Sequence, residues 1–277
     1  MATEVKPREA FIEVNGLRLH YLDWGNAAAQ PMLLLHGFTS HAHSWDTFAA
    51  ALQDRFHIVA LDQRGHGESD WAAEYTMASA IGDVDGVVKQ LGLHKMVLLG
   101  LSMGGIRSIH YTSAHPDEVE RLVIVDIGPA IPASGSARIA AGVQAQDEFD
   151  SEEEALQYLR TGNPRADEQQ MRVRLQYNLM QLPNGKFTWK WDKALRDPTS
   201  PRPRPQPEES WNAVRTITCP TLLVRGAESD VLAAETAERM QREMKDCTLV
   251  TIAGSGHPVP MDRPVDFEAT VRSWLDV

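Results

Sequence analysis

Cysteine is scarce in this chain of 277 residues, which contains only Cys219 and Cys247. Two cysteines are too few for a disulfide-stapled scaffold or a cysteine-based zinc site, so we expect reduced thiols. The chain also lacks a run of about 18 apolar residues, which excludes a helix that spans a bilayer. Its first residues mix charges where a secretory signal needs an apolar stretch. We therefore expect a cytoplasmic protein with no membrane partner.

Basic residues are in the minority. Lys and Arg total 27 against 38 Asp and Glu, which gives a formal net charge of -11. This balance disfavours binding to a phosphate backbone or to an anionic surface, so nucleic acid is not an expected partner. A hydrophobic fraction of 43% and a charged fraction of 23% are ordinary for a globular protein. The length favours one domain with a sizeable insertion, and nothing indicates an oligomeric state.

Short apolar runs alternate with segments of helical periodicity, which is typical of a mostly parallel sheet flanked by helices. The runs lack the in/out alternation of half-exposed strands, so we expect central strands buried on both faces. Before them, two further apolar segments flank Asn15-Gly16, a strong signal for an antiparallel hairpin. The runs are residues 32–35, 58–61, 96–99, 122–125, 221–224 and 249–252.

The pattern between the strands changes in the second half of the chain. A helix is expected after Thr76, a plausible N-cap, and another at the C-terminus. Between about residues 128 and 215 the sequence becomes helical and rich in proline, with no convincing strand. We therefore predict a core formed by residues 1–128 and 216–277, and a helical cap formed by residues 129–215.

The sharpest local motif is Gly100-Leu-Ser102-Met-Gly104, which follows an apolar run and precedes a helical segment. A G-x-S-x-G sequence between a strand and a helix indicates a nucleophile elbow, where a tight turn exposes a serine hydroxyl. The two glycines fit this interpretation, because side chains there would collide with the adjacent strand and helix. Ser102 is thus the candidate nucleophile.

Three further motifs stand in order along the chain: His36-Gly-Phe38 after a strand, the segment DQRGHGES at residues 62–69, and Gly-Ser-Gly-His257 near the end. With the elbow, they make the chain resemble the α/β-hydrolase superfamily, and its carboxylesterase-like members in particular, over almost its whole length. The resemblance implies an α/β-hydrolase fold, with a mostly parallel central sheet flanked by helices and a helical cap inserted after the sixth strand.

The resemblance also assigns roles. Ser102 would be the nucleophile and His257 its general base, while the backbone N–H groups of Phe38 and Met103 would form the oxyanion hole. His36 would orient the loop that carries Phe38. The histidine needs a carboxylate to fix its tautomer. Asp230, after the seventh strand, is the expected acid, and Asp126, after the sixth, is the alternative.

Aromatic residues lie near these motifs. Trp45, Trp71 and Trp189 could line an apolar pocket, or they could instead pack in the core and against the cap. His36, His41 and His43 suggest a metal cluster, but no suitably spaced carboxylate or further histidine completes it. We therefore expect neither a metal nor a cofactor.

The expected activity is hydrolysis of a small ester or related acyl compound through an acyl-enzyme. A serine at the elbow argues against epoxide opening and halide removal, because relatives with those activities use an aspartate there. Three alternatives stay open: a lactonase or a C–C bond hydrolase of ring-cleavage products, a cofactor-free oxygenase or perhydrolase, and a non-catalytic small-molecule receptor. The sequence leaves open the natural substrate, its acyl-chain length, the type of bond and the geometry of the cap.

Overall fold

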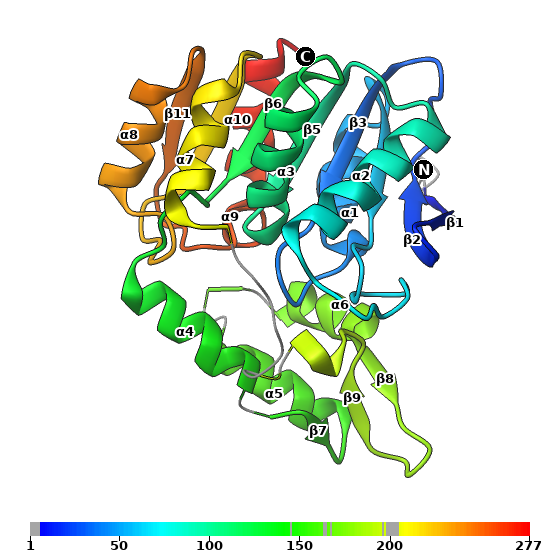
Figure 1. Ribbon diagram of the computed structural model, residues 1–277. Coiled ribbons are helices and arrows are strands. Elements are labelled where there is room, and N and C mark those ends of the chain that lie inside the picture. Colours follow the sequence, from blue (N-terminus) through cyan, green and yellow to red (C-terminus); the bar gives the residue numbers. More distant parts are fainter. Residues whose placement is uncertain (1–5, 145, 163–164, 167, 196, 198–204) are drawn as a thin grey trace.

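The computed structural model describes the chain except for residues 1–5, 145, 163–164, 167, 196 and 198–204. Across the described residues, eight strands form one sheet in the order β1-β2-β4-β3-β5-β6-β10-β11 (Figure 1). The strands are β1 (Arg8–Val14), β2 (Leu17–Asp23), β3 (Gln30–Leu35), β4 (Phe56–Leu61), β5 (Met96–Leu101), β6 (Val119–Val125), β10 (Thr221–Gly226) and β11 (Cys247–Ile252).

The pairing of the strands confirms the predicted sheet. The strands from β4 to β11 in this order are parallel, while β1 and β2 form an antiparallel hairpin and β2 runs antiparallel to β4. Asn15 and Gly16 form the hairpin turn with φ of 54° and 75°. One expectation is wrong: β11 is an edge strand rather than a central one. It has β10 as its only strand neighbour in the described sheet, and five of its six residues are partly buried or exposed.

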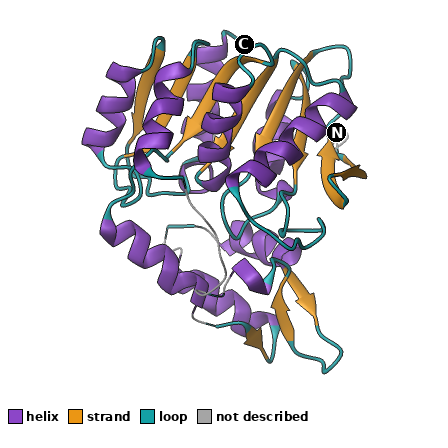
Figure 2. Ribbon diagram, viewed as in Figure 1, coloured by secondary structure: helices purple, strands orange, loops and turns teal. Residues whose placement is uncertain are grey.

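Helices cover both faces of the sheet (Figure 2). Side chains alternate between the two faces, so Leu33 and Leu35 pack on one face while Met32 and Leu34 pack on the other. The first face is covered by α2 (Met77–Leu91), α3 (Met103–Ala114), α7 (Pro207–Thr216) and α8 (Ala234–Glu243). The second face is covered by η1 (Ala42–Trp45), α1 (Asp46–Leu52), α9 (Val259–Asp262) and α10 (Pro264–Leu275).

Helix α2 begins where the sequence predicts. The hydroxyl of Thr76 accepts a hydrogen bond from the backbone N–H of Ser79, which satisfies one of the free donors of the first turn. None of the helices in the described residues is both long and apolar enough to cross a membrane.

The segment after β6, which we call the cap, lies below the carboxyl ends of the strands (Figure 1). It has its own apolar cluster, which includes Phe149, Leu156, Met171 and Trp189. Its elements are α4 (Ala133–Gln144), β7 (Glu148–Phe149), α5 (Glu152–Gly162), α6 (Glu168–Asn178), β8 (Leu179–Gln181), β9 (Phe187–Trp189) and η2 (Lys193–Leu195).

Two features of the cap correct the sequence analysis. The cap is not purely helical, because β7, β9 and β8 form a small antiparallel sheet. These strands have only two or three residues each, too few for a periodic pattern. The boundary at residue 215 is also one helix too late. Trp211 and Val214 of α7 pack in the core cluster beside α3, so α7 belongs with the core.

Candidate active site

Ser102 lies in a strained turn between β5 and α3. Its φ of 53° and ψ of -114° are unusual for a residue with a side chain, and they place it as the N-cap of α3. Glycine is required on both sides of the turn. A Cβ at Gly104 would overlap the carbonyl oxygen of Leu35, and one at Gly100 would overlap the backbone of Gly104. The motif therefore builds the tight elbow that its sequence predicts.

The elbow brings Ser102 to His257, which lies in the loop between β11 and α9. The Nε2 atom of His257 is 2.9 Å from Oγ of Ser102, and its Nδ1 atom is 2.8 Å from Oδ2 of Asp126. An ionised carboxylate only accepts hydrogen bonds, so Nδ1 carries the proton and Nε2 can accept the serine hydroxyl. Asp126 is fully buried, whereas the side chain of His257 is 15% exposed. The three side chains form an unbroken chain of hydrogen bonds.

Asp126 is held from several directions. It follows β6 with a φ of 50°, and its Oδ1 accepts a hydrogen bond from the N–H of Gly226 at 2.9 Å. Its Oδ2 also accepts the hydroxyl of Ser229. That hydroxyl oxygen itself accepts the N–H groups of Val231 and Leu232 at 3.1 and 3.2 Å, which directs its hydrogen toward Asp126. Sequence analysis missed Ser229, and the only signal was its position beside Asp230.

Asp230 does not contact His257, so the expectation that it orients the imidazole is wrong. Its carboxylate binds both Nε and Nη2 of Arg138, at 2.5 and 2.8 Å. The hydrogen bonds from Arg138 hold the pKa of Asp230 below its usual range. Neighbouring strands β6 and β10 end at the same edge, so both loops reach the site. Ser229 turns toward Asp126, while Asp230, the next residue, turns toward cap helix α4.

The predicted oxyanion loop lies against the elbow. A Cβ on Gly37 would be 3.5 Å from Cβ of Ser102, and the turn closes through a hydrogen bond from Ser40 N–H to Gly37 O at 3.2 Å. Within the part of the chain that the structure describes, the N–H groups of Phe38 and Met103 donate to no other protein group. Two backbone donors are thus available on either side of Ser102.

His36 supports this loop from the core. Its Nε2 accepts the N–H of Gln63 at 3.1 Å, so the proton is on Nδ1, which donates to the carbonyl of Gly37 at 2.7 Å. Burial lowers the pKa of His36 to about 4, so the ring is neutral near neutral pH. The side chain of Gln63 donates back to the His36 carbonyl and accepts a hydrogen bond from Arg107.

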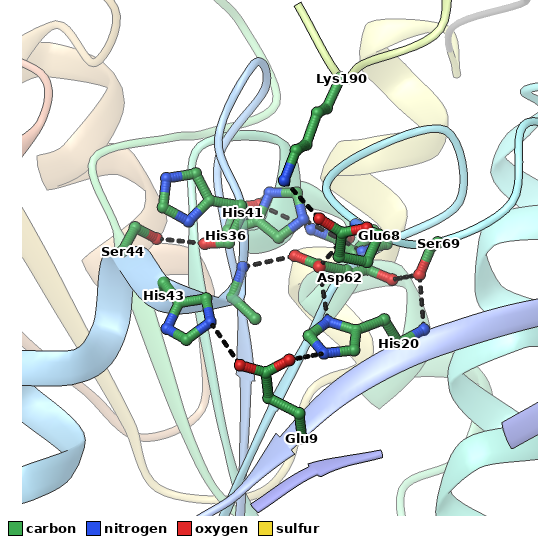
Figure 3. A network of polar contacts seen from close by, with 12 residues as sticks. Glu9, His20, His36, His41, His43, Ser44, Asp62, Glu68, Ser69 and Lys190 are labelled. Atoms are coloured by element: carbon green, nitrogen blue, oxygen red, sulfur yellow. Dashed lines mark hydrogen bonds and ion pairs between the residues drawn. The ribbon is translucent and has the colours of Figure 1, made fainter. Parts of the chain in front are cut away.

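Asp62 fixes the turn that follows β4. Figure 3 shows its carboxylate close to His20, and the hydroxyl of Ser69 close to its main-chain carbonyl oxygen. It accepts hydrogen bonds from Nδ1 of His20 at 2.8 Å, from Ala42 N–H at 2.6 Å and from Glu68 N–H at 3.0 Å. Burial alone would raise the pKa of Asp62, but these hydrogen bonds bring it well below its usual range. Asp62 thus ties the loop after β3 to the turn after β4.

A polar cavity of about 200 Å³ lies beside this network, between β1, β2, η1 and cap helix α6. No residue of the Ser102–His257–Asp126 chain lines it. The imidazole of His41 lines the cavity with neither ring nitrogen hydrogen bonded, and burial lowers its pKa to about 3. No group of three or more His, Cys, Asp or Glu side chains among the described residues could hold a metal ion.

Comparison with known proteins decides the family. The model of the Alpha/beta hydrolase family matches residues 32–270. The chain belongs to the α/β-hydrolase family. Its sequence is 30% identical over 270 residues to 3-hydroxybutyrate-oligomer hydrolase of Cupriavidus necator, covering 91% of this chain and 92% of that one. It is 28% identical over 274 residues to Lipase LipV of Mycobacterium tuberculosis, covering 93% and 97%.

Solved structures show the same fold. The structure of E-2-(acetamidomethylene)succinate hydrolase superposes with a TM-score of 0.88 at 24% identity, covering 98% of this chain and all of the other. At this identity the likeness establishes the fold alone. Because sequence relatives are named as hydrolases, esterases and lipases, this member of the family is a hydrolase of the kind that includes ester-cleaving enzymes.

Trp45, Trp71 and Trp189, the tryptophans singled out in the sequence, pack in the core or the cap or join the two. Trp45 is 1% exposed and packs against Phe48 and Phe267 in the core, and Trp189 is 3% exposed inside the cap. Of the two alternatives that the sequence left open for these rings, their burial favours packing, because both are enclosed by neighbouring side chains. Trp71 is 42% exposed and donates from Nε1 to the carbonyl of Lys190, which joins the core to the cap.

Proposed function

We propose that this protein is a serine hydrolase that cleaves a small ester or related acyl substrate, with Ser102, His257 and Asp126 as its catalytic triad. The observation that carries the proposal is the continuous chain of hydrogen bonds from Asp126 through His257 to Ser102. The relatives named as an esterase and a lipase support the choice of an ester as the substrate class.

The geometry suits acyl transfer. As Oγ of Ser102 attacks the acyl carbon, Nε2 of His257 takes the hydroxyl proton, and the Asp126 carboxylate stabilises the imidazolium. The N–H groups of Phe38 and Met103 would hydrogen bond the carbonyl oxygen as it becomes negative. His257 then gives its proton to the leaving alcohol, and an acyl-enzyme remains. Water, deprotonated by the same imidazole, releases the acid and restores Ser102.

Asp126 suits the acid role better than Asp230 for an electrostatic reason. Neutral donors hold the carboxylate of Asp126, so its charge is available to the imidazolium that forms during the reaction. The carboxylate of Asp230 is already paired with the guanidinium of Arg138. An arginine-bound carboxylate offers an imidazolium less attraction, and Asp230 makes no hydrogen bond to His257.

Hydrolysis of p-nitrophenyl esters, from acetate to palmitate, tests the proposal. We expect turnover of short chains, and a loss of at least about 10³-fold in kcat for Ser102→Ala. Ser113→Ala is the matched control, because Ser113 lies on the same helix and its hydroxyl contacts only Thr216. Equal turnover by Ser102→Ala and the wild type would contradict the proposal.

Labelling by a fluorophosphonate tests the activated serine without a substrate. We expect rapid covalent modification of the wild type and of Ser113→Ala, and none of Ser102→Ala, because only an activated hydroxyl displaces fluoride quickly. A wild-type protein that neither labels nor cleaves any ester would instead indicate a non-catalytic receptor.

A further inference from the structure

Thr39 adopts a backbone conformation that its side chain disfavours. It is the third residue of the turn Gly37–Ser40, with a φ of 58°. A type II turn needs a positive φ at this position, which is why glycine or asparagine usually occupies it. A β-branched residue there is strained, and such strain persists only where surrounding contacts enforce it. Thr39 directly follows Phe38, the proposed oxyanion donor.

The enforcing contacts come from cap helix α6. The side-chain amide of Asn178 donates to the carbonyl of Thr39 at 3.1 Å, and Nη2 of Arg174 lies 3.4 Å from its hydroxyl. Asn178 is only 2% exposed and Thr39 is partly buried, so water has limited access to this hydrogen bond. It joins two residues 139 positions apart in the chain and holds the cap to the loop.

The ring of Phe38 is held by both parts of the protein. It meets the ring of His66, from the core, edge-on at 5.7 Å between centroids, and the ring of Trp191, from the cap, at 6.1 Å. Upstream, the core fixes Gly37 through its hydrogen bond from His36. The Phe38 N–H thus lies between a residue fixed by the core and a residue fixed by the cap.

We propose that Asn178 is a positioning residue for the oxyanion hole. By holding the carbonyl of Thr39, it keeps the turn in the strained conformation that directs the Phe38 N–H to the reacting carbonyl oxygen. The cap therefore contributes to the rate of the chemical step as well as covering the site. This inference rests on the proposed serine hydrolase function.

The test compares an ester with its thionoester analogue, in which sulfur replaces the carbonyl oxygen. Sulfur is a poor hydrogen-bond acceptor, so the ratio of the two kcat/KM values measures what the oxyanion hole contributes. We expect Asn178→Ala to lower kcat for the ester about tenfold, with KM within about twofold and little change for the thionoester. The ratio should then fall about tenfold. Asn178→Ser, which is too short to reach Thr39, should do the same if the alanine variant folds poorly.

Two controls separate positioning from general structure. Asn184→Ala removes an asparagine of the same cap that bonds only its own turn, through the N–H of Lys186, and should leave the ratio unchanged. Thr39→Gly relieves the strain, since glycine adopts a positive φ freely. In the background of that variant, Asn178→Ala should change the ratio less than about twofold, because the turn no longer needs enforcement.

The outcomes distinguish this inference from the function on which it rests. Ester turnover that depends on Ser102, with an ester to thionoester ratio that Asn178→Ala and Asn178→Ser leave unchanged, overturns the positioning role alone. The positioning role is also overturned if Asn178→Ala lowers the ratio equally in the wild type and in the Thr39→Gly variant. The hydrogen bond would then not act by holding the turn in its strained conformation. Absence of any Ser102-dependent turnover overturns the proposed function and the inference with it.

Discussion

The cap meets the core along two rims of different chemistry. The β3–β4 rim, residues 36–46 and 62–75, joins the cap through the buried hydrogen bond from Tyr75 to Asp192 and the part-buried one from Asn178 to Thr39. It also has the stacking of His43 on Tyr177 and the ion pair Lys190–Glu68. The β10–β11 rim, residues 226–232 and 254–262, joins it through the ion pairs Arg138–Asp230 and Arg165–Glu228. The side chains of these last two pairs are between 36% and 51% exposed.

The difference shows which side of the cap is fixed. Buried hydrogen bonds and stacked rings hold one geometry, whereas exposed ion pairs contribute only about 0–1 kcal/mol each and weaken as salt rises. The directional contacts of the β3–β4 rim therefore fix the cap more firmly than the exposed ion pairs of the β10–β11 rim, where Ile139 of α4 packs against the core and Gly135 lies against the backbone of Asp230. Asp230 belongs to the β10–β11 rim and is partly exposed, while Asp126 is fully buried.

Replacing each of the two aspartates by asparagine, in separate variants, should give the largest difference in kcat. Asp126→Asn should lower kcat by about 10³- to 10⁴-fold, because the imidazole loses the carboxylate that fixes its tautomer and stabilises its charge. Asp230→Asn should change kcat less than about threefold, because it removes only a cap contact. Steady-state kinetics on a short p-nitrophenyl ester measures both, and the opposite pattern would restore Asp230 as the acid.

Acid should lower the free energy of unfolding through the buried histidines of the β3–β4 rim. Burial lowers the pKa of His36 to about 4 and of His41 to about 3, from an ordinary value of 6.5. The unfolded chain therefore binds protons on these rings as the pH falls below about 6.5, while the folded protein does not. Between pH 7.5 and 5, each ring should lower the free energy of unfolding by about 2 kcal/mol. Arg138 holds the pKa of Asp230 low, so that pair survives over this range.

Urea unfolding at the two pH values measures this loss of stability. His41→Phe keeps an aromatic ring beside Tyr177 but cannot take up a proton, so it should reduce the loss by about 2 kcal/mol. The same loss in this variant as in the wild type would show that His41 does not titrate during unfolding.

Removal of the hydroxyl that supports Asp126 should have a smaller effect. Ser229→Ala deletes one hydrogen bond to a charged carboxylate, while Gly226 and His257 still hold it. We expect kcat to fall about tenfold, equivalent to about 1.4 kcal/mol, with KM nearly unchanged. Ser255→Ala, in the loop of the same rim, is a control, because its hydroxyl bonds only its neighbour Gly256. Equal kcat for both variants would assign Ser229 no part in holding the acid.

Salt should give the smallest effect, and it should act on α4 at the β10–β11 rim but not on α6 at the β3–β4 rim. Raising ionic strength from about 0.05 to 0.5 M screens the Arg138–Asp230 pair, because the Debye length shrinks to a few ångström. Amide hydrogen exchange should become slightly faster in α4, which carries Arg138, and stay unchanged in α6, which carries Asn178. Equal acceleration in both helices would remove the distinction between the rims.

The local sequence pattern of apolar runs, helix caps and glycines predicted the core well. Apolar runs located the strands, Thr76 marked a helix start, and the glycines of the elbow specified a turn that only small residues permit. These features depend on residues close in sequence. The motifs also singled out Ser102 and His257, whose side chains the fold brings within hydrogen-bond distance, because each stands in a glycine-rich turn after a strand.

The remaining features depend on which way a side chain points or on contacts across the chain. Asp126 and Asp230 follow adjacent strands, and the sequence does not record that Asp126 rather than Asp230 faces the imidazole, with Ser229 turned toward Asp126. Trp45 stands near the oxyanion motif in sequence but turns toward α10 in the core. The strain at Thr39 is recognisable only once Asn178 of the cap is beside it.

Asp126 stands at the point where the chain leaves the sheet for the cap. The cap can therefore be replaced by that of another protein only if the junctions leave Asp126 in the core. A chimaera that joins a foreign cap after Gly128 and before α7 keeps the acid, the packing of Gly128 against Met240, and Trp211 in the core. It gives up the amide of Asn178 unless the graft supplies an equivalent donor. Such hybrids would separate what the cap selects from what the core catalyses.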